Sequence, residues 1–120
     1  MSVTKTRQWL GRYGEDRACE YLVGNGYEIL DRNWRFSEGE LDIVCAFQQT
    51  LVFVEVKTRT SLAFGSPFEA VTGQKLARIR RLAANWCSQK QVSNSQVRFD
   101  AIGVLVHAGK VKIEHLKQVL

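Results

Sequence analysis

Apolar and polar positions along the chain follow patterns that predict seven secondary-structure elements. Leu10, Ala18 and Leu22 recur at helical spacing, whereas residues 51–54 form a continuous apolar run typical of a buried strand. The predicted elements are a helix over about residues 6–23, strands over 27–34, 40–46 and 51–57, a helix over 72–88, and strands over 97–107 and 110–115. This α-β-β-β-α-β-β order predicts an α/β fold with a central mixed sheet flanked by helices.

The second and third predicted strands place charged residues on one face of a hairpin. Side chains alternate along a strand, so Glu55 and Lys57 lie on the same face. If the hairpin is symmetric about Gln48-Gln49, Asp42 lies opposite Glu55 and Glu40 lies opposite Lys57. The same register predicts a wholly apolar second face, which contains Leu41, Ile43, Cys45, Val52, Val54 and Val56.

This register brings two carboxylates close together. Cross-strand neighbours lie roughly 4.5–5.5 Å apart at Cβ, and two carboxylates about 5 Å apart repel by roughly 3 kcal/mol at an effective dielectric constant near 20. Lys57 and a divalent cation are the two candidates for offsetting the repulsion between Asp42 and Glu55. A hard cation held by carboxylates, with waters and phosphate oxygens completing its shell, is typical of magnesium sites.

An Asp on one strand followed by Glu-x-Lys on the next resembles the PD-(D/E)xK nuclease superfamily. Asp42, Glu55 and Lys57 stand in the three positions, although Leu41 stands where the superfamily has proline. A longer series of motifs, from about residue 13 to residue 106, resembles the YraN family of small bacterial proteins. These motifs are Gly14-Glu15, Gly39-Glu40-Leu41-Asp42, Phe53–Arg59, Phe64-Gly65-Ser66-Pro67 and Arg98-Phe99-Asp100.

The resemblance implies a restriction-endonuclease-like core, close to archaeal Holliday junction resolvases, and a metal-dependent nuclease acting on DNA or structured nucleic acid in repair or recombination. Asp42, Glu55 and the Val56 carbonyl are then expected to hold Mg²⁺ or Mn²⁺. Lys57 is expected to orient the attacking water or to neutralise charge on the phosphate. Glu15 is expected to complete the metal shell through water, whereas its position alone also fits a boundary residue paired with an arginine.

The charge distribution favours a polyanionic partner. The net charge is +5 and the sequence pI is near 9.4. Residues 70–98 contain six basic residues and no acidic residue, and a basic helix either binds a nucleic-acid backbone or is simply solvated. The residues predicted to contact the backbone are Lys75, Arg78 and Arg81 on the second helix and Arg59 in the loop after the third strand.

Several other polar and aromatic residues allow two interpretations. Trp34 and the arginines beside it either stack on a base and contact phosphates, or form core and solvated surface. Asp100 is either a further site carboxylate or a structural residue, and we favour the structural role. His107 and His115 have no metal-ligand spacing and are expected at the surface.

The remaining expectations concern domain organisation and compartment. We expect one domain over residues 1–120, with residues 1–5 frayed, in the cytoplasm, because no segment is apolar enough for a signal peptide or a membrane span. Three widely spaced cysteines lack zinc or disulfide spacing, which suits a reducing compartment. Substrate specificity is expected from a homodimer or a partner protein. The alternative functions are a non-catalytic nucleic-acid-binding adaptor and a purely structural partner protein.

Overall fold

The protein has seven helices and strands in the predicted order. The computed structural model describes residues 3–37, 39–61, 73–93 and 96–119. The elements are α1 (Val3–Gly24), β1 (Glu28–Phe36), β2 (Gly39–Phe47), β3 (Thr50–Arg59), α2 (Gly73–Lys90), β4 (Gln96–His107) and β5 (Lys110–Leu116). The Phe64-Gly65-Ser66-Pro67 motif lies outside the described residues. Among the described helices, none is long and apolar enough to cross a membrane.

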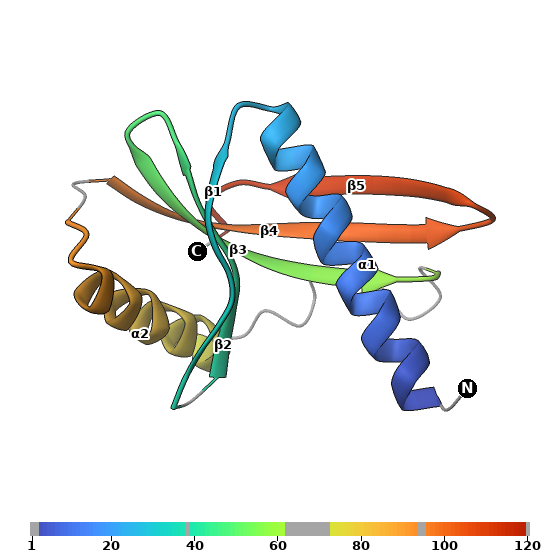
Figure 1. Cartoon of the computed structure of the whole chain (residues 1–120), viewed down its shortest axis with the longest axis horizontal. Coiled ribbons are helices and arrows are strands. Elements are labelled where there is room, and N and C mark those ends of the chain that lie inside the picture. The colour runs from blue at the N-terminus through green and yellow to red at the C-terminus, as the bar shows by residue number, and fades with distance from the viewer. Residues whose placement is uncertain (1–2, 38, 62–72, 94–95, 120) are drawn as a thin grey trace.

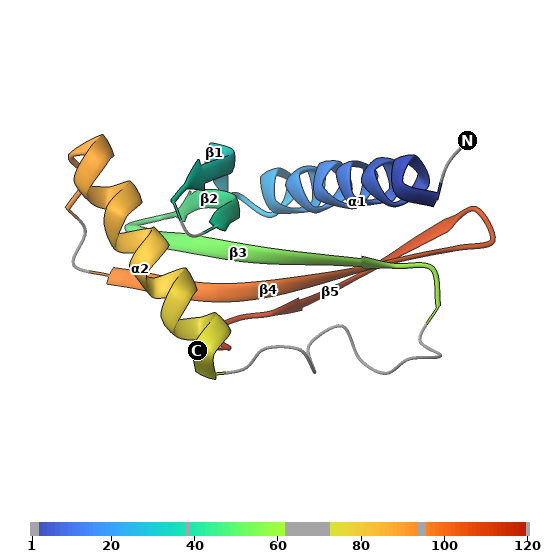
Figure 2. The ribbon, with the colours of Figure 1, turned by 90° about the horizontal axis from the view of Figure 1, so that it is seen from below.

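The strands form one five-stranded mixed sheet, which confirms the predicted α/β class. They lie in the order β1-β2-β3-β4-β5, and β3 and β4 are the parallel pair, connected through α2. The other neighbouring strands pair antiparallel. The helix α1 lies along one face of the sheet, and α2 lies on the opposite face at the end near β2 (Figures 1 and 2).

The apolar core has two halves, one under each helix, and β3 contributes to both. Val52 and Val54 pack in the cluster under α1, whereas Leu51 and Phe53 pack in the cluster under α2. Burial of each such side chain stabilises the fold by about 1.5–3 kcal/mol. The continuous apolar run in β3 therefore reflects a strand that is covered on both faces.

Close docking of α1 depends on Gly14. A Cβ atom at Gly14 would overlap the side chain of Thr58 on β3, so only glycine allows this approach of the helix to the strand. Gly14 is buried and lies on the predicted stripe with Ala18 and Leu22, both of which are fully buried. The contact brings the next residue, Glu15, beside the end of β3, where it lines a hollow with Val56 and Thr58.

The hairpin of β2 and β3 has the predicted register only near its turn. Pairing runs from the turn to Ile43 and Val54 and ends there. Beyond that point the Asp42 carboxylate replaces the strand ladder, because its Oδ2 atom accepts a hydrogen bond from the N–H group of Val56 at 2.8 Å. We use the term fork for residues 39–42 of β2 and residues 55–59 of β3, where the pairing has ended.

Two predictions for this hairpin are wrong because of the fork. Glu40 does not lie opposite Lys57; it pairs with Arg35 on β1, and the Arg35 Nε donates to its carboxylate at 3.0 Å. Leu41 packs in the cluster under α2 rather than on the face under α1. Asn33 lies on β1, next to Trp34, which pairs with Leu41. Its φ of 51° produces a kink in β1 beside the point where side-chain alternation breaks in β2.

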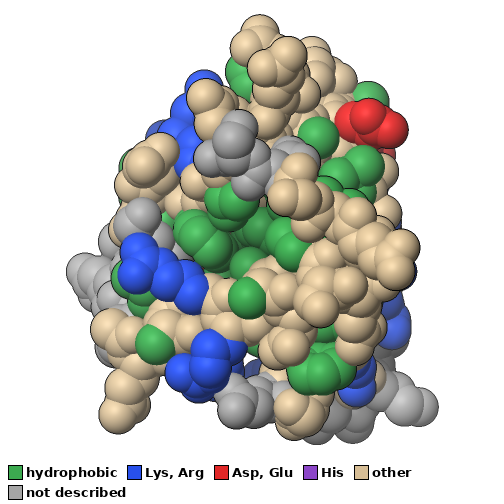
Figure 3. Space-filling view, turned by 90° about the vertical axis from the view of Figure 1, so that its left-hand side faces the viewer, with side chains coloured by type: hydrophobic (Ala, Val, Ile, Leu, Met, Phe, Trp, Pro, Cys, Tyr) green, Lys and Arg blue, Asp and Glu red, His purple; other side chains and the backbone are tan. Residues whose placement is uncertain are grey.

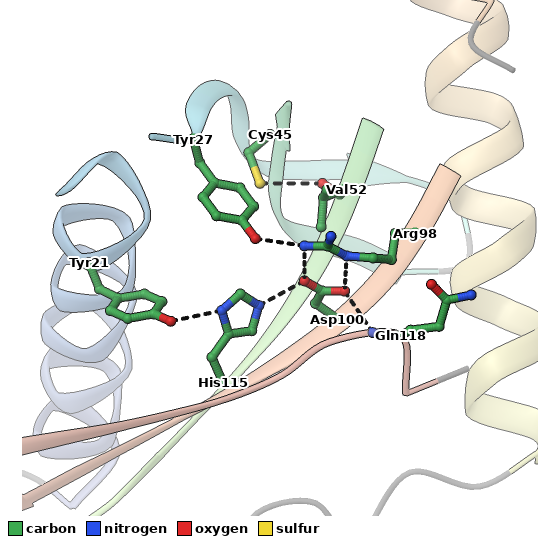
Figure 4. A network of polar contacts seen from close by, with 8 residues as sticks. All are labelled: Tyr21, Tyr27, Cys45, Val52, Arg98, Asp100, His115 and Gln118. Carbon is green, nitrogen blue, oxygen red and sulfur yellow. Dashed lines mark hydrogen bonds and ion pairs between the residues drawn. The ribbon is translucent and has the colours of Figure 1, made fainter. Parts of the chain in front are cut away.

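A buried polar network connects α1 with β4 and β5 (Figure 4). Asp100 is only 2% exposed and accepts two hydrogen bonds from Arg98, both at 2.8 Å. The Nε2 atom of His115 lies 2.7 Å from the same carboxylate, and its Nδ1 atom lies 3.0 Å from the Tyr21 hydroxyl. The Gln118 N–H group donates to Asp100 at 3.0 Å. Asp100 is thus structural, whereas the prediction of a surface His115 is wrong because its side chain is only 4% exposed.

This network explains how a buried carboxylate stays charged. Burial alone would raise the pKa of Asp100, but hydrogen bonds from His115, Arg98 and the Gln118 backbone outweigh burial and hold that pKa below its ordinary value. The hydrogen bond to Asp100 also raises the pKa of Arg98. A charge removed from water is tolerated when its lone pairs are satisfied in this way.

Candidate metal centre at the fork

Three carboxylates from two elements meet at the fork. Glu15 comes from α1, and Glu40 and Asp42 come from β2. One oxygen atom of each carboxylate lies within 4.8 Å of one oxygen atom of the other two. The arrangement lies where β2 has separated from β3 and where Gly14 lets α1 approach Thr58 closely. We call these three residues the carboxylate cluster.

The carboxylate cluster is poorly suited to holding all its charges without a cation. Burial, and then repulsion from Glu55, raise the pKa of Asp42 to about 7, although the hydrogen bond from the Val56 backbone opposes this rise. Burial raises the pKa of Glu15 as well and Glu40 adds to that rise, although a hydrogen bond with the Asn33 side chain opposes it. The Oε1 atom of Glu15 is buried and has no hydrogen-bond partner among the described residues. A proton or a bound cation would relieve this repulsion.

The predicted site residue Glu55 lies beside the cluster rather than inside it. Its Oε1 atom lies 2.9 Å from the Nζ atom of Lys75 on α2, and both side chains are about one quarter exposed, at 27% and 24%. Glu55 is nevertheless near enough to be the second cause of the raised pKa of Asp42. The fold therefore brings Glu15 and Asp42 together with Glu55 nearby, and Glu55 contacts Lys75 on α2, a pairing not predicted from the sequence.

Lys57 lies one strand repeat beyond Glu55 and is exposed. It borders an open hollow of about 340 Å³ between α1 and β3, which Glu15 also lines. The other residues that line this hollow are Arg7, Leu10, Gly11, Val56 and Thr58.

Glu40 is the one member of the cluster that the sequence interpretation did not place there. The predicted register assigned it to Lys57 as a cross-strand partner. The spacing of Glu40 from Asp42 is the signal that points to the cluster, because residues two apart on a strand share a face. The predicted pairing with Lys57 directed Glu40 elsewhere. Its carboxylate also pairs with the Arg35 side chain, which is 85% exposed, so solvent screens this ion pair.

Comparison with known proteins assigns the family. Residues 14–104 match the family described as "Uncharacterised protein family UPF0102". The chain belongs to the UPF0102 family. This UPF0102 protein is 50% identical over 116 residues to a UPF0102 protein of Beutenbergia cavernae, covering 96% of this chain and 98% of that protein. It is 50% identical over 114 residues to one of Frankia casuarinae, covering 94% and 97%, and 49% identical over 116 residues to one of an Arthrobacter species, covering 96% and 98%.

The cationic residues of this UPF0102 protein that were predicted to bind nucleic acid lie on two elements. Arg78 and Arg81 are exposed on α2, and Lys75 near the start of that helix contacts Glu55. Arg59 belongs to β3 rather than to a loop, which corrects the prediction, and its buried Nε atom has no hydrogen-bond partner among the described residues. Figure 3, which views the molecule from the left-hand side of Figure 1, shows cationic side chains around an apolar patch.

Trp34 adopts the structural alternative in this UPF0102 protein. It is half-buried, packs against the cluster under α2, and stacks on Phe36 with ring centroids 5.4 Å apart. Trp86, on α2, donates its indole N–H to Asp31 at 2.9 Å. These contacts attach α2 to β1 and so help to fix the helix that carries Lys75.

The chemistry of the carboxylate cluster fits a hard divalent cation in this UPF0102 protein. All of its donors are carboxylate oxygens, which suit Mg²⁺ or Mn²⁺. The raised pKa of Asp42 and the unpaired Oε1 atom of Glu15 are both features that a bound cation would relieve. Asp42, Glu15 and Glu40 are therefore the residues best placed to hold one, with Glu55 adjacent. A role for the Val56 carbonyl stays a prediction.

Proposed function

We propose that this UPF0102 protein is a metal-dependent nuclease that hydrolyses phosphodiester bonds in DNA or structured nucleic acid. The observation that carries the proposal is the carboxylate cluster, in which burial raises the pKa of Asp42 to about 7. A fold gains no stability from such a cluster, so its presence favours a role in binding a cation. The resemblance of Asp42, Glu55 and Lys57 to the PD-(D/E)xK pattern supports the same function.

Mg²⁺ or Mn²⁺ would be held by Asp42 together with Glu15 and Glu40, and by Glu55 when its carboxylate is available. When bound, such an ion would stabilise charge on a phosphate and lower the pKa of a water molecule. The described contacts support this donor set, because three of the four carboxylates already lie close together.

The chain's own residues then have distinct roles. The Lys57 ammonium, exposed at the border of the hollow that Glu15 lines, would neutralise charge that develops on the phosphate or orient the attacking water. The exposed cations of α2 would bind the backbone without reading its sequence, because phosphate contacts carry no base information. The Asp42 carboxylate, fixed by the Val56 N–H group, would keep its orientation during the reaction.

A second candidate function is a nucleic-acid-binding adaptor that does not cleave. One observation favours it: Arg35 and Lys75 neutralise Glu40 and Glu55, respectively, by ion pairs within the chain. Two of the four carboxylates therefore have cationic partners without a metal. The adaptor would share the backbone contacts of α2 but would have no dependence on a divalent cation.

Cleavage of a substrate panel distinguishes the two functions. The panel contains duplex, single-stranded, flap and four-way-junction DNA and the matching RNA forms, each incubated with Mg²⁺, Mn²⁺ or a chelator. A nuclease cleaves at least one substrate only with metal, and both Asp42→Asn and Glu55→Gln abolish that cleavage. An adaptor binds the same substrates with affinities that fall with salt but leaves them intact. Equal cleavage by the parent and Asp42→Asn would indicate a contaminating nuclease.

A further inference from the structure

The contact between Glu55 and Lys75 separates one carboxylate from the other three. Glu15, Glu40 and Asp42 lie within one 4.8 Å group, whereas Glu55 lies next to that group and contacts the Lys75 ammonium at 2.9 Å. Asp42 and Glu55 also line the same small cavity next to β3, so the two carboxylates are neighbours. A modest movement of the Glu55 side chain, without any change in β3, would bring its oxygen atoms to the cluster.

The Lys75 ammonium opposes cation binding in the arrangement described. A divalent cation at the cluster would be repelled by this ammonium, and Glu55 cannot give its full charge to a cation while it is paired with Lys75. Both side chains are about one quarter exposed, so solvent screens the pair only in part. Another anion must pair with the Lys75 ammonium in place of Glu55 before Glu55 becomes a good metal ligand.

The position of Lys75 indicates which anion that is. It is three residues from Arg78 on α2, so the two side chains lie on neighbouring parts of one helix surface. Five basic residues and no acidic residue occur in α2, over residues 73–90. A phosphate backbone bound along the exposed arginines of α2 would therefore place a phosphate within reach of the Lys75 ammonium.

We infer that Lys75 couples metal binding to nucleic-acid binding. In the free protein the ion pair with Lys75 holds Glu55 away from the carboxylate cluster. When a nucleic-acid phosphate pairs with the Lys75 ammonium instead, the Glu55 carboxylate becomes available to bind the cation. The inference rests on the proposed function and deepens it, because it makes the full metal site conditional on substrate. Lys75 is a positioning residue in this scheme, since it acts through Glu55 rather than on the reacting atoms.

The coupling must be reciprocal. If nucleic acid raises the affinity for metal by some factor, metal raises the affinity for nucleic acid by the same factor. The second quantity is the easier one to measure, because free nucleic acid binds divalent cations itself. The coupling factor is therefore the ratio of the nucleic-acid Kd without metal to the Kd with metal, at constant ionic strength.

The experiment uses the full chain and two measurements that do not require cleavage. The first is binding of Mn²⁺ to the free protein, followed by the electron paramagnetic resonance signal of free Mn²⁺. The second is anisotropy of a fluorescein-labelled duplex DNA with phosphorothioate linkages, with Mn²⁺ and without it. The variants are Lys75→Gln, Lys75→Arg and the control Lys90→Gln, which removes the same charge from the far end of α2, where Lys90 lies 3.8 Å from Asp31.

The expected results differ among the variants. The parent shows a coupling factor of about 5 or more. Lys75→Gln binds Mn²⁺ roughly 10-fold more tightly in the absence of DNA, because a nearby positive charge is gone, and its coupling factor falls close to 1. Lys75→Arg retains most of the coupling, and Lys90→Gln resembles the parent in both measurements. If Lys75→Gln does not fold, Lys75→Met, which keeps the apolar stem, replaces it.

Other outcomes overturn the inference in distinguishable ways. A Lys75→Gln protein that binds Mn²⁺ no more tightly than the parent and keeps the parental coupling factor shows that Lys75 is an ordinary structural partner of Glu55. In that case the proposed nuclease function stands. If neither the parent nor Lys75→Gln binds Mn²⁺ with or without DNA, the metal centre itself is wrong and both proposals fall.

Discussion

Replacement of Asp42 by asparagine tests the candidate metal centre through stability as well as activity. Asparagine keeps the shape of the side chain and an oxygen atom that can accept the Val56 N–H group, but it removes the charge. The pKa of Asp42 is raised from its ordinary value near 3.8 to about 7, first by burial and then by Glu55. The folded state therefore binds the Asp42 proton more strongly than the unfolded state does.

The sign of the effect follows from this difference. Between about pH 4 and pH 7 the folded protein holds more protons than the unfolded chain, so the Asp42 contribution to the unfolding free energy falls as the pH rises. At about 1.4 kcal/mol per pKa unit, the full rise corresponds to about 4 kcal/mol. Water entry, and the weaker hydrogen bond from Val56 to an uncharged acceptor, reduce the net difference between Asp42→Asn and the parent to about 1–3 kcal/mol at pH 8.

The assay is urea unfolding of metal-free protein at a series of pH values from 5 to 8. Relative to the parent, Asp42→Asn is expected to become steadily more stable as the pH rises from 5 to 8, and to be the more stable protein at pH 8. Glu114→Gln, which removes an exposed carboxylate on β5, is the matched control and should show no growing difference. Addition of Mg²⁺ at ten times its Kd should stabilise the parent by about 1.4 kcal/mol and leave Asp42→Asn unchanged.

Parallel pH profiles for the parent and Asp42→Asn would refute the reasoning, because they would mean that Asp42 is ionised at no cost in the folded protein. Loss of folding in Asp42→Asn would instead show that the bond to Val56 is a structural requirement. A variant that responds to Mg²⁺ like the parent would remove Asp42 from the metal centre.

Three further predictions concern the residues around the cluster. Lys57→Ala should abolish cleavage, because the ammonium is proposed to act at the reacting phosphate, and should leave nucleic-acid binding within a few-fold, as gel assays and anisotropy measure. Its stability should be nearly unchanged, because the side chain is exposed. Replacement of Arg78 and Arg81 by alanine should weaken binding and reduce the log-log salt slope by roughly 2, measured by anisotropy across a salt series. Gly14→Ala should cost about 1–3 kcal/mol in urea unfolding, because the new methyl group meets β3, whereas Gly11→Ala, with open space around it, should be neutral or stabilising.

Each of these predictions has a clear contrary result. A Lys57→Ala protein that still cleaves would remove the ammonium from the reaction. An unchanged salt slope in the double arginine variant would move the nucleic-acid contact away from α2. Equal stability of Gly14→Ala and Gly11→Ala would mean that α1 does not depend on close approach to β3.

The regular parts of the fold could be predicted because they depend on local periodicity. The register near the hairpin turn was predicted correctly, since an apolar face allows only one alignment of Ile43 with Val54. The two-sided burial of β3 was likewise readable from its continuous apolar run. The closeness of Asp42 and Glu55 was expected from the hairpin register, whereas the place of Glu15 beside them was expected only from the family resemblance.

The errors arise where long-range contacts override the pattern. The fork could not be predicted, because a side chain of β2 satisfies a backbone group of β3, and because Leu41 lies on the face under α2, opposite a kink at Asn33 on β1. The pairing of Glu55 with Lys75 joins positions 20 residues apart, and no local signal connects them. The burial of His115 could not be predicted from its place near the end of a strand, because it depends on Asp100, a partner on another strand.

The polar network around Asp100 also has a consequence for synthesis of the chain on the ribosome. Every carboxylate of the candidate metal centre has been made by residue 55, but the network that connects α1 to the sheet needs His115 and the backbone of Gln118. Until β5 emerges, Asp100 would be a buried anion lacking two of its donors, and β4 has just one of its two neighbouring strands. A nascent chain therefore carries the whole set of site residues before the contact between Tyr21 on α1 and His115 on β5 can form, so this polar attachment of α1 is added only when the final strand joins the sheet.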